Sequence, residues 1–289
     1  MASIKEFNNK LKSLKNTQKI TRTMKMVSAS KLRRAQDAQT NAKLYAKSIT
    51  ELVSRIALAA DATAHPLFKS SDNPKKALIL IFTSDKGLCG AFNHNANKKV
   101  NQWIEDNKSN FDQIDVSCCG KRGYAFFKKL KRVREHYESI TIKPDFKEAK
   151  KIGEDLMDHF ISEEYDEVYM SYNQFFSPLS QTTIFQKVLP IEPNELLEEI
   201  PESDSREYIY EPETTKLLDF LVPHYLYFKV YFALLENSAG EHGARMTAMD
   251  NATNNASDMI DSYTLRRNRA RQAAITTELT EIVSGAEAL

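Results

Sequence analysis

The chain has 289 residues, a mass of 33.0 kDa and a formal net charge of +1. This length predicts one or two domains, and a content of 42% hydrophobic residues excludes a disordered chain. The small net charge argues against a protein that binds nucleic acid through its overall charge. No run of residues is long and apolar enough to span a membrane, and the first ten residues lack the apolar core of a signal peptide.

The cysteine content indicates a reducing compartment. The three cysteines, Cys89, Cys118 and Cys119, are an odd number in a long chain, which is typical of reduced thiols in a cytosolic-type environment. Because successive side chains of a strand point to opposite faces, we expect Cys118 and Cys119 to lie on different faces of one strand.

Two segments almost without helix breakers flank the middle of the chain. Residues 1–65 contain neither Gly nor Pro, and residues 244–284 are also free of both. Apolar residues of the first segment recur at steps of three and four, namely Ile4, Phe7, Leu11 and Leu14, then Tyr45, Ile49, Leu52, Ile56 and Ala59. The second carries small residues where a partner helix would lie, Ala248, Ala252, Ala256, Ala270, Ala273 and Ala274, followed by Ile275, Leu279 and Ile282. These patterns predict two long terminal helices that form an antiparallel coiled coil; two helices of a globular bundle are the alternative.

The middle of the chain alternates between strand and helix patterns. The expected strands are Ala77–Thr83, Ile114–Cys118, Glu167–Tyr172 and Thr182–Leu189, and the expected helices are Asn93–Asp106, Tyr124–Lys131 and Phe146–Ile161. The apolar run ALILIFT is typical of a buried parallel strand. The predicted class is therefore α/β, with a small Rossmann-like central domain at 66–211 between an N-terminal shaft helix at 1–65 and a C-terminal shaft helix at 212–289.

The turn Thr83–Gly90 is the first place to look for catalysis, because it joins a strand to a helix. It matches neither a Walker A loop nor a dinucleotide fingerprint. Cys89 could be an activated thiol there, or a buried residue of a packed turn; Gly120–Gly123 allows the same two interpretations. Asp155 and His159 form an isolated pair on a charged helix, and no group of residues has the spacing of a metal site. We therefore expect no catalytic residue, no cofactor and no metal.

Positive charge is concentrated at the N-terminus. Residues 1–37 hold ten Lys and Arg against two acidic residues, a net charge of +8, and Arg266, Arg267, Arg269 and Arg271 form a second cluster. Met24, Met26 and Val27 lie among the first group, which favours a contact surface over a merely solvated face. Such a surface could bind nucleic acid or an acidic protein partner.

Three blocks of sequence resemble the gamma subunit family of F-type ATP synthases. They are NTQKITRTMKMVSASKLRRAQ at Asn16–Gln36, TSDKGLCGAFN at Thr83–Asn93, and ENSAGEHGARMTAMDNATNNASDMI at Glu236–Ile260, which continues through Asn268–Leu289. The resemblance covers the whole chain in the family's order. It implies a non-catalytic rotor subunit whose paired helices lie inside a ring of alternating alpha and beta subunits and couple ion flow to ATP synthesis.

The resemblance also implies residue roles. Met24 and Lys25 match a segment that faces an acidic lever of a beta subunit, and Arg245 lies in the opposing part of the second helix as a further beta contact. Arg271 with Gln272 matches a pair that hydrogen-bonds a beta loop. Tyr208, Tyr210 and Glu211 match a foot that touches the membrane rotor ring and the epsilon subunit, and Ala286–Leu289 matches a tip in an apolar bearing.

The implied partners are the alpha and beta subunits, epsilon and the membrane rotor ring, with no nucleic acid. The implied location is peripheral, on the cytoplasmic face of a bacterial inner membrane, reached only through the complex. The sequence shows neither a transit peptide nor the two-cysteine insert of the chloroplast form.

The chain departs from the family at a few positions. Gly240 and Gly243 replace small residues with better helix propensity, Arg267 replaces an aromatic residue and Tyr263 replaces Leu. Two other hypotheses stay open from the residues alone: a basic coiled coil that binds nucleic acid, and a small α/β enzyme that uses Lys86 and Cys89.

Overall fold

The computed structural model describes residues 4–59, 65–192, 211 and 213–287. The chain divides into two compact units, Ser30–Ala244 and the pair Met1–Ala29 with Arg245–Leu289. Helices α1 (Ile4–Ala59) and α6 (Thr214–Glu287) each contribute residues to both units. The boundaries between these units therefore fall inside the two long helices. The predicted division into three parts, with boundaries at 65 and 211, stays a prediction.

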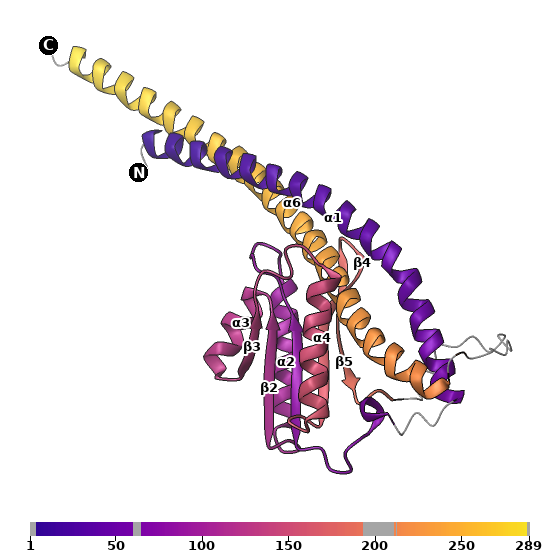
Figure 1. The fold of residues 1–289 in the computed structure, drawn as a ribbon. Helices are drawn as coiled ribbons and strands as arrows, with labels where there is room; N and C mark the ends of the chain where they lie inside the picture. The colour runs from indigo at the N-terminus through magenta and orange to yellow at the C-terminus, as the bar shows by residue number, and fades with distance from the viewer. Residues whose placement is uncertain (1–3, 60–64, 193–210, 212, 288–289) are drawn as a thin grey trace. The chain divides into compact units, whose positions relative to one another are not determined.

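The Ser30–Ala244 unit contains a five-stranded sheet in the order β3-β2-β1-β4-β5 (Figure 1). Its strands are β1 (Lys76–Phe82), β2 (Gln113–Cys119), β3 (Val133–Tyr137), β4 (Glu167–Ser177) and β5 (Ser180–Leu189). The first four strands run parallel to one another, and β5 pairs antiparallel with β4. The predicted α/β class with a parallel core is confirmed.

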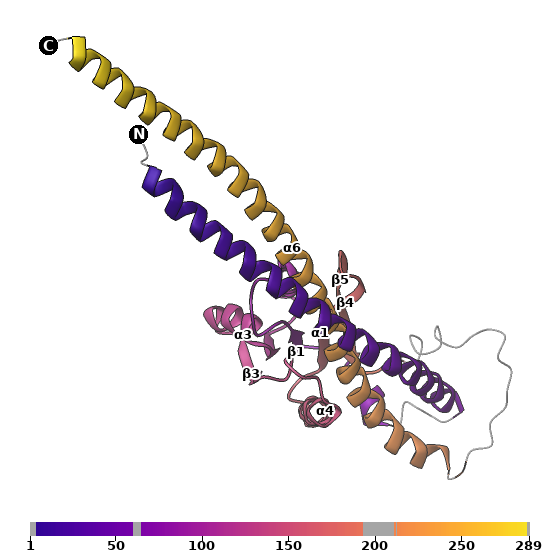
Figure 2. The ribbon, with the colours of Figure 1, turned by 90° about the horizontal axis from the view of Figure 1, so that it is seen from above.

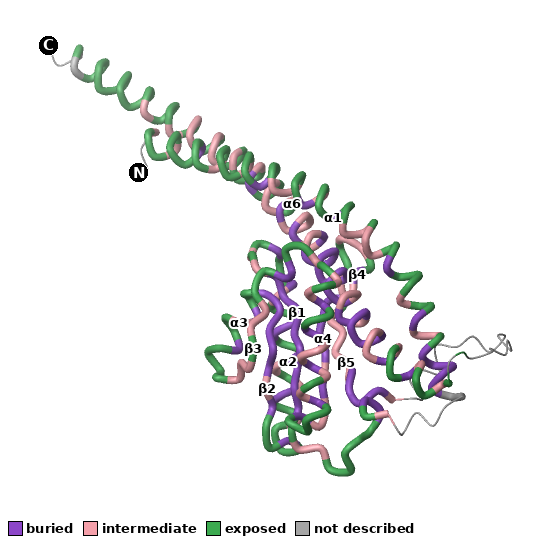
Figure 3. Tube along the Cα trace, in the orientation of Figure 1, coloured by how far each residue is buried: buried purple, intermediate pink, exposed green. Residues whose placement is uncertain are grey.

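Helices cover both faces of this sheet. They are α2 (Phe92–Asn107), α3 (Lys121–Phe127) and α4 (Phe146–Ile161), with short 3₁₀ turns η2 (Pro66–Phe68) and η3 (Lys128–Leu130). Helix α2 packs on one face and α4 on the other, and Figure 2 shows α4 viewed along its axis. Alternate residues of β1 face different cores: Ile79 packs with α2, whereas Leu80 packs with α4 and with parts of α1 and α6. Every residue of β1 after Lys76 is fully buried, which explains its continuous apolar run (Figure 3).

The predicted helix at Tyr124–Lys131 is placed differently in the structure. Helix α3 begins three residues earlier, at Lys121, and gives way to a 3₁₀ turn after Phe127. Strand β3 was not predicted at all. Its sequence, VREHY, is mostly polar, as is typical of a strand at the edge of a sheet, so it lacks the apolar run that identified the central strands.

Cys118 and Cys119 lie on opposite faces of β2, as predicted. Cys118 packs with the α2 cluster and Cys119 with the cluster on the other face, and both side chains are fully buried. Burial raises the pKa of Cys118 to about 12 and that of Cys119 well above its usual value. All three cysteines are free thiols.

Helices α1 and α6 run antiparallel in both units. In the smaller unit Phe7 lies beside Tyr263, with ring centroids 6.3 Å apart, and Thr21 lies beside Thr253. In the larger unit Gln39 Nε2 donates to Glu236 Oε1 over 2.6 Å. As the residue number in α1 rises, the number of the α6 residue that it contacts falls. The predicted antiparallel arrangement of the two helices is therefore confirmed.

Gly240 and Gly243 lie inside α6, which continues through both. A Cβ at Gly240 would lie 3.0 Å from Cε2 of Phe92, and one at Gly243 would lie 3.0 Å from Cε2 of Phe175. The glycines therefore let α6 pack closely against α2 and β4, which gives a physical reason for this departure from the family pattern.

Candidate partner-binding surface of the paired helices

The smaller unit presents the basic segment of α1 beside the middle of α6. Lys25 Nζ lies 2.6 Å from Asp250 Oδ1, and the two side chains keep 41% and 43% of their surface exposed. Met24 is half-buried next to this pair. The ion pair keeps the Lys25 ammonium in a defined position while leaving one side of it open to solvent.

The contact between the two helices is small and partly polar here. The buried residues that α1 contributes are Leu11, Thr21 and Ser28, and those of α6 are Arg245, Met249 and Ala256. The hydroxyl groups of Thr21 and Thr253 are 2.7 Å apart and share a hydrogen bond. Ala256 is buried and Ala248 and Ala252 are half-buried, in agreement with the predicted small-residue face.

Exposed apolar side chains lie on the same segment of α1. Ile20 is 59% exposed, Met26 58% and Val27 51%. This segment of α1 therefore presents a mixed surface of apolar and basic side chains, and exposed apolar residues that lie close together are a common feature of contact surfaces.

Arg245 occupies a different environment from Lys25. It is only 8% exposed and already interacts within the chain. The sequence grouped it with Met24 and Lys25 as a partner contact, but the structure places it in the interior of the unit rather than on its surface.

Most residues in the C-terminal part of α6 are exposed, and from Ile275 onward every residue whose burial is described is exposed (Figure 3). Arg271 and Gln272 are both exposed, and so is Ala273, whereas Ala270 and Ala274 are half-buried. The apolar residues that follow are uncovered: Ile275 is 48% exposed, Leu279 57% and Ile282 67%. Their spacing of four and three residues places them along one stripe of the helix, called here the tip stripe.

The foot residues are mostly outside the described part of the chain. Tyr208 and Tyr210 lie outside the described residues, and Glu211 is exposed before the start of α6. Ala286 is exposed, and the last two residues of the predicted tip also lie outside the described range.

The turn after β1 is a packed structural turn. Thr83 and Ser84 are fully buried and Cys89 is 2% exposed. Asn93 accepts from the Ser84 backbone N–H over 2.8 Å and donates to Cys89 Sγ over 3.1 Å. The thiol is thus enclosed by the turn and the start of α2, which favours the structural interpretation of Cys89.

The second glycine turn packs onto the first. Gly120 has a φ of +104°, and a Cβ there would lie 2.4 Å from the carbonyl oxygen of Thr83. The Gly123 N–H donates to Thr83 Oγ1 over 2.8 Å, and Asp85 Oδ1 accepts from the Lys121 N–H over 3.0 Å. Asn237 of α6 reaches the same Thr83 carbonyl over 3.4 Å. The second and third sequence blocks therefore meet in the fold.

The pair Asp155 and His159 is not isolated, which corrects the sequence interpretation. Arg134 of β3 binds Asp155, and His159 Nδ1 lies 2.6 Å from Glu164 Oε2. Tyr137 also donates to Asp155, so the cluster connects the edge strand to α4. Sequence reasoning missed it because the strand that carries Arg134 was not predicted. Among the described residues, no group of three or more His, Cys, Asp or Glu could hold a metal ion.

Comparisons with known proteins match this arrangement over the full chain. The family model described as ATP synthase matches residues 3–289. The ATP synthase gamma chain of Trichlorobacter lovleyi is 44% identical over 289 residues, covering 100% of this chain and 99% of the relative. That of Geobacter metallireducens is 45% identical over 291 residues, with the same coverage. The chain belongs to the ATP synthase gamma chain family.

Solved structures agree with this membership. A chain in the central stalk and c-ring structure of Tetrahymena thermophila mitochondrial ATP synthase is 27% identical, with a TM-score of 0.61, and the match covers 81% of this chain and 99% of that chain. A chain of the Euglena gracilis mitochondrial enzyme shows the same fold at 20% identity, with a TM-score of 0.67, and the match covers 99% of this chain and 94% of that chain. As a gamma-family chain, the molecule is a central stalk subunit of F-type ATP synthase. Within its described residues, no helix has both the length and the apolar character needed to cross a membrane.

Proposed function

We propose that this gamma-family chain is the non-catalytic rotor shaft that couples ion flow through a membrane ring to ATP synthesis in a ring of alpha and beta subunits. The proposal rests on one observation: apolar and basic side chains of the C-terminal part of α6 are exposed. Exposing a continuous stripe of apolar side chains to water is unfavourable, so this stripe indicates a surface that another protein covers.

The proposed mechanism is a coupling of distant equilibria. A shaft that makes different contacts with each beta subunit favours a different conformation in each, and its rotation changes these preferences in turn. Exposed ion pairs suit this task, because each contributes only about 0.2–1 kcal/mol and is easily released. Lys25 is suited to such a contact, because it can return to the ion pair with Asp250 of its own chain when the partner moves away.

The proposed contacts follow the family positions. Met24 and Lys25 face the acidic lever of a beta subunit, and Arg271 with Gln272 holds a beta loop. Arg245 joins these contacts only if its side chain leaves the interior position that it has in this structure. Tyr208, Tyr210 and Glu211 form the proposed contact with epsilon and the rotor ring.

The proposed location and chemistry follow from these contacts. The chain acts on the cytoplasmic face of a bacterial inner membrane and reaches the membrane only through the complex. Nucleotide chemistry belongs to the beta subunits, the chain itself needs no cofactor, and nucleic acid is not a partner.

The first test is assembly. We expect co-expression with alpha and beta subunits to yield a stable complex with one copy of this chain per ring, and an ATPase rate that depends on the chain. A folded chain that fails to join soluble alpha and beta subunits would contradict the proposal, and salt-dependent binding of nucleic acid would then be measured next.

A second test addresses the residues deeper in the ring. Replacing both Arg271 and Gln272 by Ala should lower the ATPase rate of the assembled complex without preventing assembly, because exposed polar side chains contribute little to the fold of α6 itself. The matched control replaces Lys98 and Lys99, an adjacent exposed pair on α2, and should leave the rate unchanged. Equal rates for the two double variants would remove the assigned contact.

A further inference from the structure

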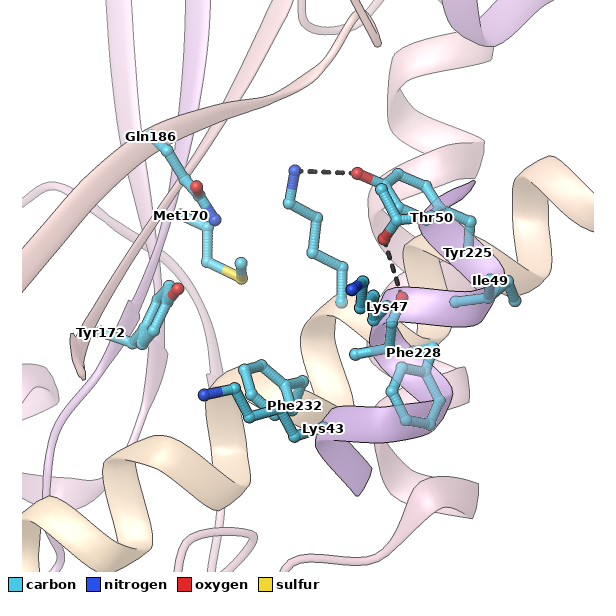
Figure 4. Close-up of a pocket in the computed structure, with 12 residues that line it drawn as sticks. Lys43, Lys47, Ile49, Thr50, Met170, Tyr172, Gln186, Tyr225, Phe228 and Phe232 are labelled. Atoms are coloured by element: carbon cyan, nitrogen blue, oxygen red, sulfur yellow. Dashed lines mark hydrogen bonds between the residues drawn. The ribbon is translucent and has the colours of Figure 1, made fainter. Parts of the chain in front are cut away.

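A cavity of about 400 Å³ lies in the larger unit between the sheet and the two long helices. Strands β4 and β5 form one wall, and segments of α1 and α6 form the others (Figure 4). This volume falls in the range of small-molecule sites rather than of grooves that accept a protein segment.

The floor of the cavity is apolar. Met170 of β4 is 1% exposed, and Ile49 of α1 and Phe228 of α6 are also buried. Met170 projects from the strands toward the space that Thr50 and Phe228 border from the helices (Figure 4). Aliphatic, aromatic and thioether groups of this kind accept a flexible apolar chain without requiring one fixed shape.

The described residues that line the cavity carry charge of a single sign. They include Lys43, Lys47 and Lys229, and none of the Asp and Glu residues that the structure describes is among them. Lys43 and Lys47 are exposed, whereas Lys229 is half-buried and donates to the Tyr225 hydroxyl over 3.2 Å. Among the described residues, no carboxylate lies within ion-pair distance of these three ammonium groups.

The three ammonium groups repel one another beside an apolar floor, and an anion bound between them would relieve this repulsion. We propose that this cavity binds an amphipathic organic anion, with its apolar chain against Met170 and Phe228 and its negative head group between Lys43 and Lys229. The side-chain amide of Gln186, on the wall that strands β4 and β5 form, can donate a further hydrogen bond to the head group. The ligand class is an anion of the fatty-acid type, either free or as part of a lipid.

Binding is tested with the full chain and decanoate below its micelle concentration, because decanoate carries a carboxylate on one flexible apolar chain. In a protein with ¹³C-labelled methionine methyl groups, the Met170 signal, assigned with Met170→Leu, should shift and saturate. Decanol and decylammonium, which share the tail but lack the negative charge, should bind at least about tenfold more weakly, since a hydrogen bond to a charged group is worth about 1.5–3 kcal/mol.

Two variants separate the head group from the tail. Lys43→Gln with Lys229→Gln should weaken decanoate binding by about tenfold or more, whereas Lys98→Gln on α2 removes a charge elsewhere and should have no effect. Ala46→Leu extends a half-buried side chain on the cavity wall and should reduce binding with all three lysines intact.

The outcomes decide the proposal directly. Parallel shifts of all methionine signals, equal binding of decanoate and decanol, or equal loss in Lys98→Gln and in the lysine double variant would each overturn it. Capture by vesicles of anionic lipid that the same double variant abolishes would identify a lipid as the source of the anion, and saturable decanoate binding without such capture would identify a free acid.

Discussion

The larger and smaller units hold their helices in place by different means. In the larger unit Leu80 and Leu156 are fully buried in a core that the sheet, α4 and parts of both long helices share. In the smaller unit the helices meet through a few buried residues, a threonine pair and the ion pair of Lys25 with Asp250. Burial of apolar surface contributes about 25 cal/mol per Å², whereas an exposed ion pair contributes at most about 1 kcal/mol. The larger unit therefore provides most of the stability, and the smaller unit leaves apolar and basic side chains exposed.

The largest expected difference between the units comes from a matched pair of leucines. Leu156→Ala should lower the free energy of unfolding by about 3–5 kcal/mol, because the surrounding core cannot close the cavity. Leu11→Ala should cost about 2 kcal/mol or less, because Leu11 lies between two exposed helices that can move together. Denaturant unfolding followed by circular dichroism measures both values. Equal losses would contradict the comparison.

A smaller loss is expected where α6 is anchored to the sheet and to α1. Glu236 is 3% exposed; its Oε1 accepts from Gln39 and its Oε2 accepts from the Phe175 backbone N–H over 2.7 Å. Glu236→Ala leaves both donors without this acceptor and should lower the free energy of unfolding by about 2 kcal/mol.

The control for this anchor is Glu236→Gln, which keeps one acceptor oxygen and nearly the same shape. It should retain more stability than Glu236→Ala in the same urea titration. If the two variants unfold at the same denaturant concentration, the acceptor role of this side chain is wrong.

The buried thiols of β2 should make the larger unit sensitive to alkaline pH. Because the pKa of Cys118 is raised to about 12 in the folded chain, the unfolded chain loses its proton first as the pH rises past the ordinary thiol pKa. Each thiol then lowers stability by up to about 1.4 kcal/mol per pH unit above that value. Unfolding of the chain and of Cys118→Ala should be compared at pH 8 and pH 10, and the chain with Cys118 should lose more. Equal losses would show that the thiol ionises in the folded state.

The smallest effect belongs to the ion pair of the smaller unit. A double-mutant cycle of Lys25→Ala and Asp250→Ala should give a coupling energy below about 1 kcal/mol, because both side chains remain accessible to water and salt. Raising the salt concentration should reduce it further. A coupling energy of several kcal/mol would show that the pair is a structural anchor and not a contact that is easily released.

The features predicted well were those with a strong local pattern. The scarcity of Gly and Pro predicted the two long helices, and the apolar run of β1 predicted a buried parallel strand. Strand β3 was missed because an edge strand is stabilised by its pairing with β2, which its own mostly polar sequence does not reveal. Because β3 was not predicted, the ion pair of Arg134 with Asp155 was not predicted either, since only the sheet brings these two residues together.

The partner contacts themselves stay a prediction. Met26, Arg271 and the tip stripe are exposed, whereas the burial of Arg245 could not be inferred from its position in the third block. Of the three cavity lysines, Lys43 and Lys47 lie one helical turn apart on α1, but Lys229 comes from α6, and no local pattern relates it to the other two.

The sequence by itself determined the periodicity of the long helices, the alternation of strand and helix between them, and the family to which the chain belongs. These properties depend on neighbouring residues, or on blocks whose order along the chain is enough. Only the tertiary structure decided which charges are paired, why Gly240 and Gly243 lie inside α6, and where lysines from two helices meet over an apolar floor. Such contacts join residues that are distant in the chain, and their energies depend on burial and distance, which a linear pattern does not contain.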